Sequence, residues 1–311
     1  MVIRNSDIPQ HLTPGLKVIY NERMETATRD WDKIATSMTS NKIQESYGFL
    51  AGLSYMKRWV DERQEQGLSE QSFVIRNYPA ESTISVDRDT LADDLTGDVK
   101  LNVMGLADDA MDYKESLVFN LLNNGFADLC YDGQAFFDTT HPWAGTTVSN
   151  TQSGAGSVLS RDSIQTALVQ MRSLKKNNGI TPMVVKPDTL IVPPALEETA
   201  LEILNSPLLI PIDVTTGGAV ATQGNTNTMY KRIANLIVSP FLTSTTAWFL
   251  LDTSKAVRPL ILQERETPQF VALDRPDSDQ NFLKRKILYG VDWRGGAGYA
   301  LWQFAHGSAG A

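Results

Sequence analysis

The sequence has very little cysteine and no long apolar run, and each shortage excludes a class of protein. Among 311 residues there is one cysteine, Cys130, so no disulfide forms within the chain and a structural zinc site built on several thiolates is excluded. No stretch approaches the roughly 18 consecutive apolar residues of a membrane-spanning helix. The first 20 residues carry Pro9 and Pro14 instead of the apolar core of a secretory signal. We therefore expect a soluble globular protein that stays in a reducing compartment.

Positive charge is also in short supply. The chain has 28 Lys and Arg against 36 Asp and Glu, which gives a net charge of -8. Contacts from basic side chains to phosphates supply most of the affinity of proteins for nucleic acids. This charge balance therefore disfavours a protein whose main task is to hold nucleic acid tightly.

Motifs for catalysis and metal binding are missing as well. The histidines His11, His141 and His306 form no pair at metal-ligand spacing, and no phosphate-binding loop, dinucleotide fingerprint or serine-nucleophile elbow occurs. Cys130 and His141 are the only plausible nucleophile and base. No third, orienting residue is specified for them, so a buried and inert cysteine is the favoured interpretation. We expect no catalytic residue, no cofactor and no metal.

Three of the predicted helices can be described by their caps and apolar residues. The longest covers residues 103–124 and ends at Gly125, with apolar positions at Val103, Leu106, Ala107, Ala110, Tyr113, Leu117 and Leu121. A second covers residues 161–176, with Ser160 as its N-cap and an apolar stripe of Ile164, Leu168, Met171 and Leu174. In the polar N-terminal segment, Thr13 as N-cap and Pro14 at the first helical position predict one short helix.

The segment after residue 47 favours an extended hairpin. Residues 56–61 and 72–76 have strand character, and the polar stretch between them, which contains Gly67, indicates a turn. A two-stranded hairpin is only marginally stable in water, so one that carries Trp59 and Phe73 requires a surface to lie on. A neighbouring subunit is one candidate for that surface.

Two segments rich in Gly, Ser, Thr and Asn, residues 144–157 and 215–228, are predicted to be exposed, mobile loops. They bracket residues 160–211, which read as helix, strand and helix and are therefore candidates for an inserted subdomain. Residues 247–311 are mostly strand-like. The basic run Lys284, Arg285 and Lys286 lies within an alternating strand pattern there, which predicts a structural or intersubunit salt bridge.

Five strings identify a family when they are taken together. They are WDKIA at 31–35, ESYGFLAGLSYMKRWVDER at 45–63, CYDGQAFFDTTHP at 130–142, SKAVRPLILQER at 254–265 and LYGVDWRGGAGYALWQFA at 288–305. In this order they resemble the major head subunit of Mu-like tailed bacteriophages, the gpT family. The resemblance spans nearly the whole chain.

The resemblance implies an α+β protein with the Hong-Kong-97 type of major capsid protein fold. Residues 1–39 would be an N-terminal arm, 40–89 an extended loop, 90–143 a peripheral domain with its spine helix, 144–253 an axial domain, and 254–311 a return to the peripheral domain. An acidic container that needs no catalytic cluster agrees with the chemistry above.

The resemblance also implies a function and partners. The chain would be a major capsid protein that self-assembles into hexamers and pentamers of an icosahedral head around the phage double-stranded DNA, with only weak, non-specific DNA contact. It would assemble in the bacterial host cytoplasm with a scaffold protein, and meet a portal and decoration proteins, but no membrane. Aromatic and basic residues dominate interfaces, so the candidates for subunit contacts are Trp59, Arg63, Phe73, Arg58, Trp31, Lys284 and Arg285.

Two alternatives remain open at this point. One is an encapsulin-like shell of the same fold that forms a cellular compartment. The other is an enzyme that uses Cys130 and His141. Neighbouring genes would separate the first from a phage head, and particle formation by a Cys130→Ala variant would argue against the second.

Overall fold

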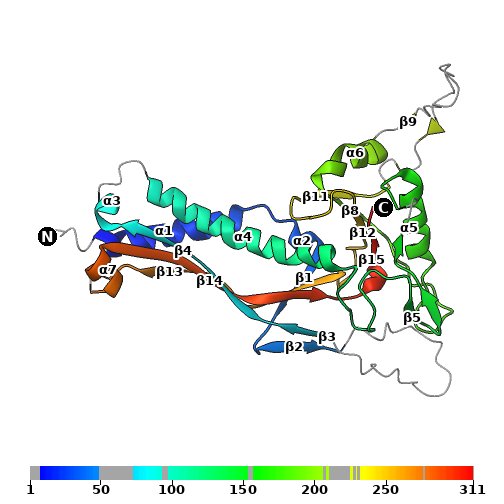
Figure 1. Ribbon diagram of the computed structural model, residues 1–311, viewed down its shortest axis with the longest axis horizontal. Coiled ribbons are helices and arrows are strands. Elements are labelled where there is room, and N and C mark those ends of the chain that lie inside the picture. The colour runs from blue at the N-terminus through cyan, green and yellow to red at the C-terminus, as the bar shows by residue number, and fades with distance from the viewer. Residues whose placement is uncertain are drawn as a thin grey trace.

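The computed structural model describes residues 8–48, 73–92, 97–152, 157–205, 208–209, 225–226, 229, 232–275 and 277–310. The chain forms two regions joined end to end, one elongated and one compact (Figure 1). The long-sheet region consists of the described residues before 126 and of residues 258–300. The compact region consists of the described residues from 126 to 257 and of residues 301–310.

A four-stranded sheet, in the order β1-β13-β14-β4, is the frame of the long-sheet region. Its centre is the antiparallel pair β13 (Leu260–Leu273) and β14 (Lys286–Tyr299). The strand β4 (Tyr78–Asp87) lies antiparallel to β14, and β1 (Ala35–Thr39) lies parallel to β13. Side chains along β14 are mostly buried in alternation, as expected for a strand with one face against a helix.

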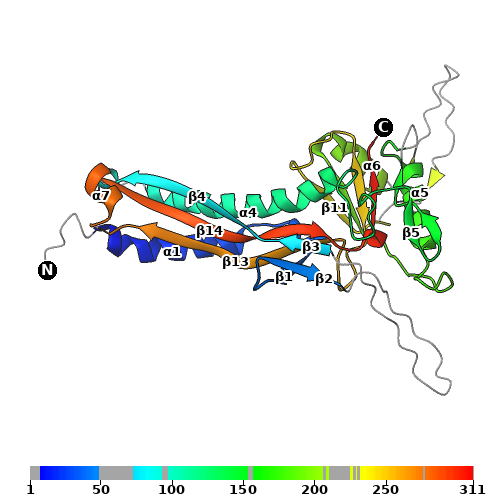
Figure 2. The same ribbon diagram turned by 60° about the horizontal axis from the view of Figure 1, so that its bottom comes forward.

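The helix α4 (Asp98–Asn124) runs along this sheet (Figure 2) and confirms the helix predicted at 103–124, with five more residues at its start. The predicted stripe is buried as far as Ala110, but its second half shifts by one residue. Lys114, Val118 and Leu122 are buried, whereas Tyr113 is 39% exposed. In its second half, α4 therefore buries a face that the apolar pattern did not indicate.

The N-terminal helix α1 (Ile8–Thr26) is longer than predicted. The expected start at Thr13 and Pro14 is wrong: Pro14 lies inside the helix, and the Thr13 hydroxyl donates to Asp274 at 2.6 Å. Leu16 and Tyr20 are buried in a core cluster shared with α4, β13 and β14. The arm thus packs on its own subunit, and the chain continues through α2 (Trp31–Ile34) into β1.

The base of the predicted hairpin is present. Strand β3 (Phe73–Arg76) confirms strand character at 72–76, and it pairs antiparallel with β2 (Gln44–Tyr47). The predicted partner at 56–61 lies outside the described residues. Beneath β3, Gly296 and Gly298 of β14 make room, because an added Cβ would come within 2.3 Å of the Arg76 carbonyl oxygen and 2.5 Å of the Phe73 ring, respectively.

A five-stranded mixed sheet, in the order β11-β8-β12-β15-β7, is the centre of the compact region. The strands are β7 (Thr151–Gln152), β8 (Thr189–Val192), β11 (Asn235–Val238), β12 (Trp248–Leu251) and β15 (Ala305–Ser308). Every residue of β8, β12 and β15 is buried. The helices α5 (Arg161–Ser173) and α6 (Glu197–Asn205) lie beside this sheet (Figure 1).

The predictions for the compact region are mostly confirmed. Ser160 caps α5, since the Ser163 amide donates to the Ser160 hydroxyl at 3.2 Å, and all four residues of the predicted stripe are buried. The strand and helix expected after residue 188 are β8 and α6, joined by the 3-10 turn η2 (Pro194–Leu196).

The first predicted loop is more ordered than expected. Within 144–152, β6 (Thr146–Val148) pairs with β5 (His141–Trp143), and β7 pairs with β15. Of the second loop, only β10 (Asn225–Thr226) is described, and it pairs with β9 (Leu208–Leu209). Strands of two or three residues are too short to show an apolar alternation, so the sequence pattern did not reveal them.

Residues 254–311, expected to return to the peripheral domain, are divided between the two regions. Residues 260–299 belong to the long sheet, but β15 pairs with β12 inside the compact region. The turn η3 (Trp302–Phe304), in which Trp302 is fully buried, redirects the chain between the two sheets. The small helices α3 (Arg88–Ala92) and α7 (Asp279–Lys284) cap the far end of the long sheet (Figure 1). Within the described residues, no helix is both long and apolar enough to cross a membrane.

Candidate functional site

The structure brings Cys130, Asp132 and His141 together in the compact region. The Cys130 thiol donates to Asp132 Oδ1 at 3.0 Å, and His141 Nδ1 lies 2.7 Å from Asp132 Oδ2. The other imidazole nitrogen, Nε2, lies 3.1 Å from Asn150 Oδ1, and the ring stacks on Trp302 with centroids 4.0 Å apart. Sequence reasoning missed Asp132, although it stands only two positions after Cys130.

The order of these contacts does not suit a thiol nucleophile. A base must contact the nucleophile that it activates, yet Asp132 lies between the sulfur and the imidazole. Burial, together with the hydrogen bond to Asp132 and its negative charge, raises the pKa of the Cys130 thiol well above its usual range. Asp132 itself is also buried, but hydrogen bonds from His141 and Cys130 outweigh that effect and lower its pKa. The thiol therefore stays protonated, and the carboxylate holds both neighbours in place.

The same three residues are the only group in the described part of the chain with metal-ligand geometry. Their ligand atoms lie within 4.8 Å of one another. A structural zinc site takes four ligands, whereas this group offers three, and their polar atoms already contact one another or Asn150. The arrangement is better suited to fixing the CYDGQAFFDTTHP segment against Trp302 than to holding an ion.

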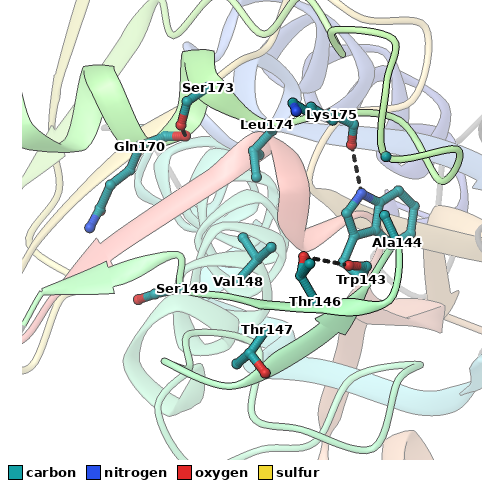
Figure 3. A pocket seen from close by; sticks show the side chains of 11 residues that line it. Trp143, Ala144, Thr146, Thr147, Val148, Ser149, Gln170, Ser173, Leu174 and Lys175 are labelled. Atoms are coloured by element: carbon teal, nitrogen blue, oxygen red, sulfur yellow. Dashed lines mark hydrogen bonds between the residues drawn. The ribbon is translucent and has the colours of Figure 1, made fainter.

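A hollow of about 430 Å³ lies between the end of α5 and the β5–β6 hairpin (Figure 3). Its lining is mostly hydroxyl, amide and aliphatic, from residues such as Thr146, Ser149, Gln170 and Leu174. The Trp143 indole donates to the Lys175 carbonyl oxygen at 2.7 Å and closes one side. No nucleophile and base are paired among its lining residues, so it is not a catalytic pocket of a recognisable type.

Of the predicted interface residues, Trp59, Arg58 and Arg63 lie outside the described residues. Phe73 is half-buried against its own subunit, with its ring centroid 6.4 Å from that of Tyr299. It therefore supports the base of the hairpin, and an additional contact with a neighbour stays a prediction.

Trp31 requires a correction as an interface candidate. It is only 5% exposed and belongs to the core, with the Lys114 ammonium 5.8 Å from its ring centroid. The Asp30 amide beside it donates to the buried Glu115 carboxylate at 2.6 Å. Trp31 therefore anchors the arm within the subunit and has no surface free for a neighbour.

Lys284 and Arg285 are exposed, but not in a strand as predicted. Lys284 ends α7, Arg285 adopts a left-handed conformation with φ of 54°, and β14 begins only at Lys286. The Arg285 carbonyl oxygen accepts a hydrogen bond from the Arg88 amide at 3.0 Å. Their role in subunit contacts remains a prediction.

A buried ion pair that the sequence did not reveal fastens the long-sheet region. The Lys114 ammonium of α4 pairs with the Glu264 carboxylate of β13, and the Trp293 indole donates to the same carboxylate at 3.1 Å. The Lys114 side chain is 5% exposed and the Glu264 side chain 16%. Glu264 stands where the β13–β14 register shifts, so the pair fixes the helix and the arm to the irregular part of the sheet.

Comparisons with known proteins identify the family. The family described as Mu-like prophage major head subunit gpT matches residues 10–159, 154–242 and 243–311. The major capsid protein of Escherichia phage Mu is 28% identical over 282 residues, which cover 91% of this chain and 67% of that protein. The Mu-like prophage FluMu major head subunit of Haemophilus influenzae is 24% identical over 300 residues, covering 96% of this chain and 72% of that protein.

The fold comparison agrees with the sequence comparison. A chain from the procapsid of bacteriophage JBD30 superimposes with a TM-score of 0.56 and 26% identity, covering 96% of this chain and 75% of that chain. The expected α+β fold of the Hong-Kong-97 type is thereby confirmed. With the family match extending over almost the entire sequence, the chain belongs to the Mu-like gpT family of major head subunits.

Proposed function

We propose that this chain forms the shell of a Mu-like phage head by assembling with copies of itself into hexamers and pentamers that close into an icosahedron around double-stranded DNA. The observation that carries the proposal is the family match over residues 10–311. The family match also favours a phage head over the encapsulin-like compartment.

We assign the two regions of the fold to the two domains expected of such a subunit. The long-sheet region corresponds to the peripheral domain with α4 as its spine helix, and the compact region corresponds to the axial domain. The boundaries differ from those expected, because residues 305–308 pair within the compact region. The hairpin that starts at β2 and β3 corresponds to the base of the extended loop.

A purely structural role agrees with the chemistry of the Cys130 cluster. Its thiol is held protonated and is separated from the imidazole by Asp132. A Cys130→Ala variant is expected to assemble like the natural protein. Loss of a hydrolytic or transfer activity in that variant would favour the enzyme hypothesis instead.

The remaining partners follow from the proposed role. Assembly in the host cytoplasm would need a scaffold protein, and the finished virion would add a portal and decoration proteins to the shell. The net charge of -8 favours only weak contact with packaged DNA, because like charges repel and basic residues are in the minority.

Expression with and without the scaffold protein tests the proposal directly. Sedimentation and negative-stain microscopy should show closed shells or capsomer-sized oligomers. A strictly monomeric chain at all concentrations, with scaffold present, would contradict the proposed function.

A further inference from the structure

One end of the compact region is basic and carries exposed apolar side chains. This basic segment, residues 172–186, contains four basic residues and no acidic one, namely Arg172, Lys175, Lys176 and Lys186. Within it, Ile180 is 80% exposed and Val184 is 58% exposed. Large aliphatic side chains exposed together beside charges are typical of a contact surface.

The backbone of the basic segment is strained where it presents Val184. This residue has φ of 47°, a left-handed conformation that β-branched residues rarely adopt. Lys255 holds it there by donating to the Val184 carbonyl oxygen at 2.8 Å. The strained conformation holds the Val184 side chain in solvent, where it adds nothing to the core of the isolated subunit.

The other end of the compact region has the opposite charge. This acidic helix, residues 194–205 with η2 and α6, contains Glu197, Glu198 and Glu202 and no basic residue. Glu197 and Glu198 lie in the first turn of α6, where negative charge stabilises a helix. Glu202 lies beyond that turn, so the helix dipole does not account for it. Next to it, Leu201 is 41% exposed.

The two surfaces lie at opposite ends of strand β8. The basic segment ends just before β8 begins at Thr189, and η2 begins just after β8 ends at Val192. In Figure 1, α6 lies at the top of the compact region and the β5–β6 hairpin, against which Lys175 packs, lies at the bottom. A single subunit therefore cannot bring the two surfaces together.

We infer that the basic segment of one subunit docks on the acidic helix of the next copy of this chain, head to tail, within a capsomer. The partner follows from the charges. Like charges repel, so neither surface pairs with its own copy across a two-fold axis, whereas the basic segment and the acidic helix have complementary charges. A contact between different surfaces of identical chains closes into a ring when the rotation allows. The inference rests on the proposed function, because it names the contact that would build the hexamers and pentamers.

Charge reversal with compensation tests this contact. Lys175→Glu with Lys186→Glu reverses the basic surface, and Glu198→Lys with Glu202→Lys reverses the acidic one. We expect each double variant to lower the assembled fraction at least tenfold in sedimentation, and the fourfold variant, in which the charges are complementary again, to return to within about threefold of the natural protein. Lys175→Arg with Lys186→Arg is the matched control that keeps the charge, and it should assemble normally.

Circular dichroism and thermal melting establish that each variant is folded. If the acidic reversal does not fold, Glu198→Gln with Glu202→Gln replaces it, with a smaller loss expected. Folded reversals that assemble like the natural protein, or a folded fourfold variant no better than either double variant, would overturn the inference. Failure of the natural protein itself to assemble with scaffold would instead contradict the proposed function, so the two failures are distinguishable.

Discussion

The compact region and the long-sheet region bury their side chains in different ways. Every residue of β8, β12 and β15 in the compact region is buried, whereas β4 of the long-sheet region has one buried residue in ten. The long sheet is covered on one face by α1 and α4, whose apolar side chains pack on β4, β13 and β14. The compact region therefore buries whole strands, whereas the long-sheet region buries one face of its sheet in a core with α1 and α4 and adds polar contacts between these elements.

The buried polar groups follow the same division. In the compact region, Asn150 links His141 to the Phe136 carbonyl oxygen, and the network lies against fully buried Trp302. In the long-sheet region, the Lys114–Glu264 ion pair fixes separate elements to one another. The comparison can be tested by removing one side chain from the buried network of the compact region and one from the ion pair of the long-sheet region.

The largest effect is expected for Trp302→Ala in the compact region. The side chain is fully buried, stacks on His141 and contacts Trp143 edge-on with centroids 6.0 Å apart. Its removal should lower the free energy of unfolding by about 3–5 kcal/mol. Urea denaturation followed by tryptophan fluorescence and circular dichroism measures the change. Tyr113→Ala, at a 39% exposed position of α4, is the control and should cost much less.

The next largest effect is expected for Lys114→Met in the long-sheet region. Removal of the ammonium leaves Glu264 largely buried without its partner, which should cost about 3 kcal/mol. Hydrogen exchange should increase in α1, α2 and β13 while β8 and β12 stay protected. Lys114→Met with Glu264→Gln should recover part of the loss. Uniform exchange across both regions would show that the ion pair is not a local contact of the long-sheet region.

Trp59→Ala should separate assembly from folding. Truncation of an interface tryptophan costs about 2 kcal/mol per contact, and every subunit of a shell would lose it. We expect a folded subunit with few intact particles by electron microscopy. Phe73→Ala is the informative comparison, because Phe73 packs on Tyr299 and should also lower the melting temperature. If Trp59→Ala formed normal shells, the proposed role of the hairpin in subunit contacts would be wrong.

A pH effect of about 2 kcal/mol is expected from the compact region. Burial lowers the pKa of His306 to about 3, and neither of its ring nitrogens has a hydrogen-bond partner among the described residues. The unfolded chain therefore binds a proton that the folded chain does not, so stability is lost as pH falls below about 6.5 toward 3, at about 1.4 kcal/mol per unit. Denaturation at pH 7 and pH 5 should differ by about 2 kcal/mol. The difference should shrink in His306→Leu, and an unchanged difference would assign it to other groups.

The smallest effect concerns the helix starts. The Ser160 hydroxyl caps α5, whereas α4 begins after Gly97 without a side-chain cap. Ser160→Ala should cost about 1 kcal/mol in thermal denaturation, and Ser160→Thr should restore most of it. No measurable loss would show that the packing of Ile164 and Leu168 alone determines where α5 begins.

Local signals in the sequence predicted the local elements well. The N-cap at Ser160, the apolar stripe of α5, the stop of α4 near Gly125 and the strand at 189–192 all depend on neighbours within one or two turns. The start of α1 was misplaced because Pro14, a usual first-turn residue, is tolerated inside this helix. The strand predicted around Lys284 and Arg285 began too early, because the short helix α7 ends at Lys284 and β14 begins only at Lys286.

The sequence by itself determined the family, the helical and extended segments, the acidic character and the scarcity of catalytic groups, because each depends on residue identity or short-range spacing. Only the tertiary structure decided which partners meet: Lys114 with Glu264, Asp132 between Cys130 and His141, and β15 beside β12. These contacts join residues whose separation in the chain carries no periodic signal. They form because burial in a shared core makes an unpaired charge or an open strand edge costly, and that cost exists only once the chain has folded.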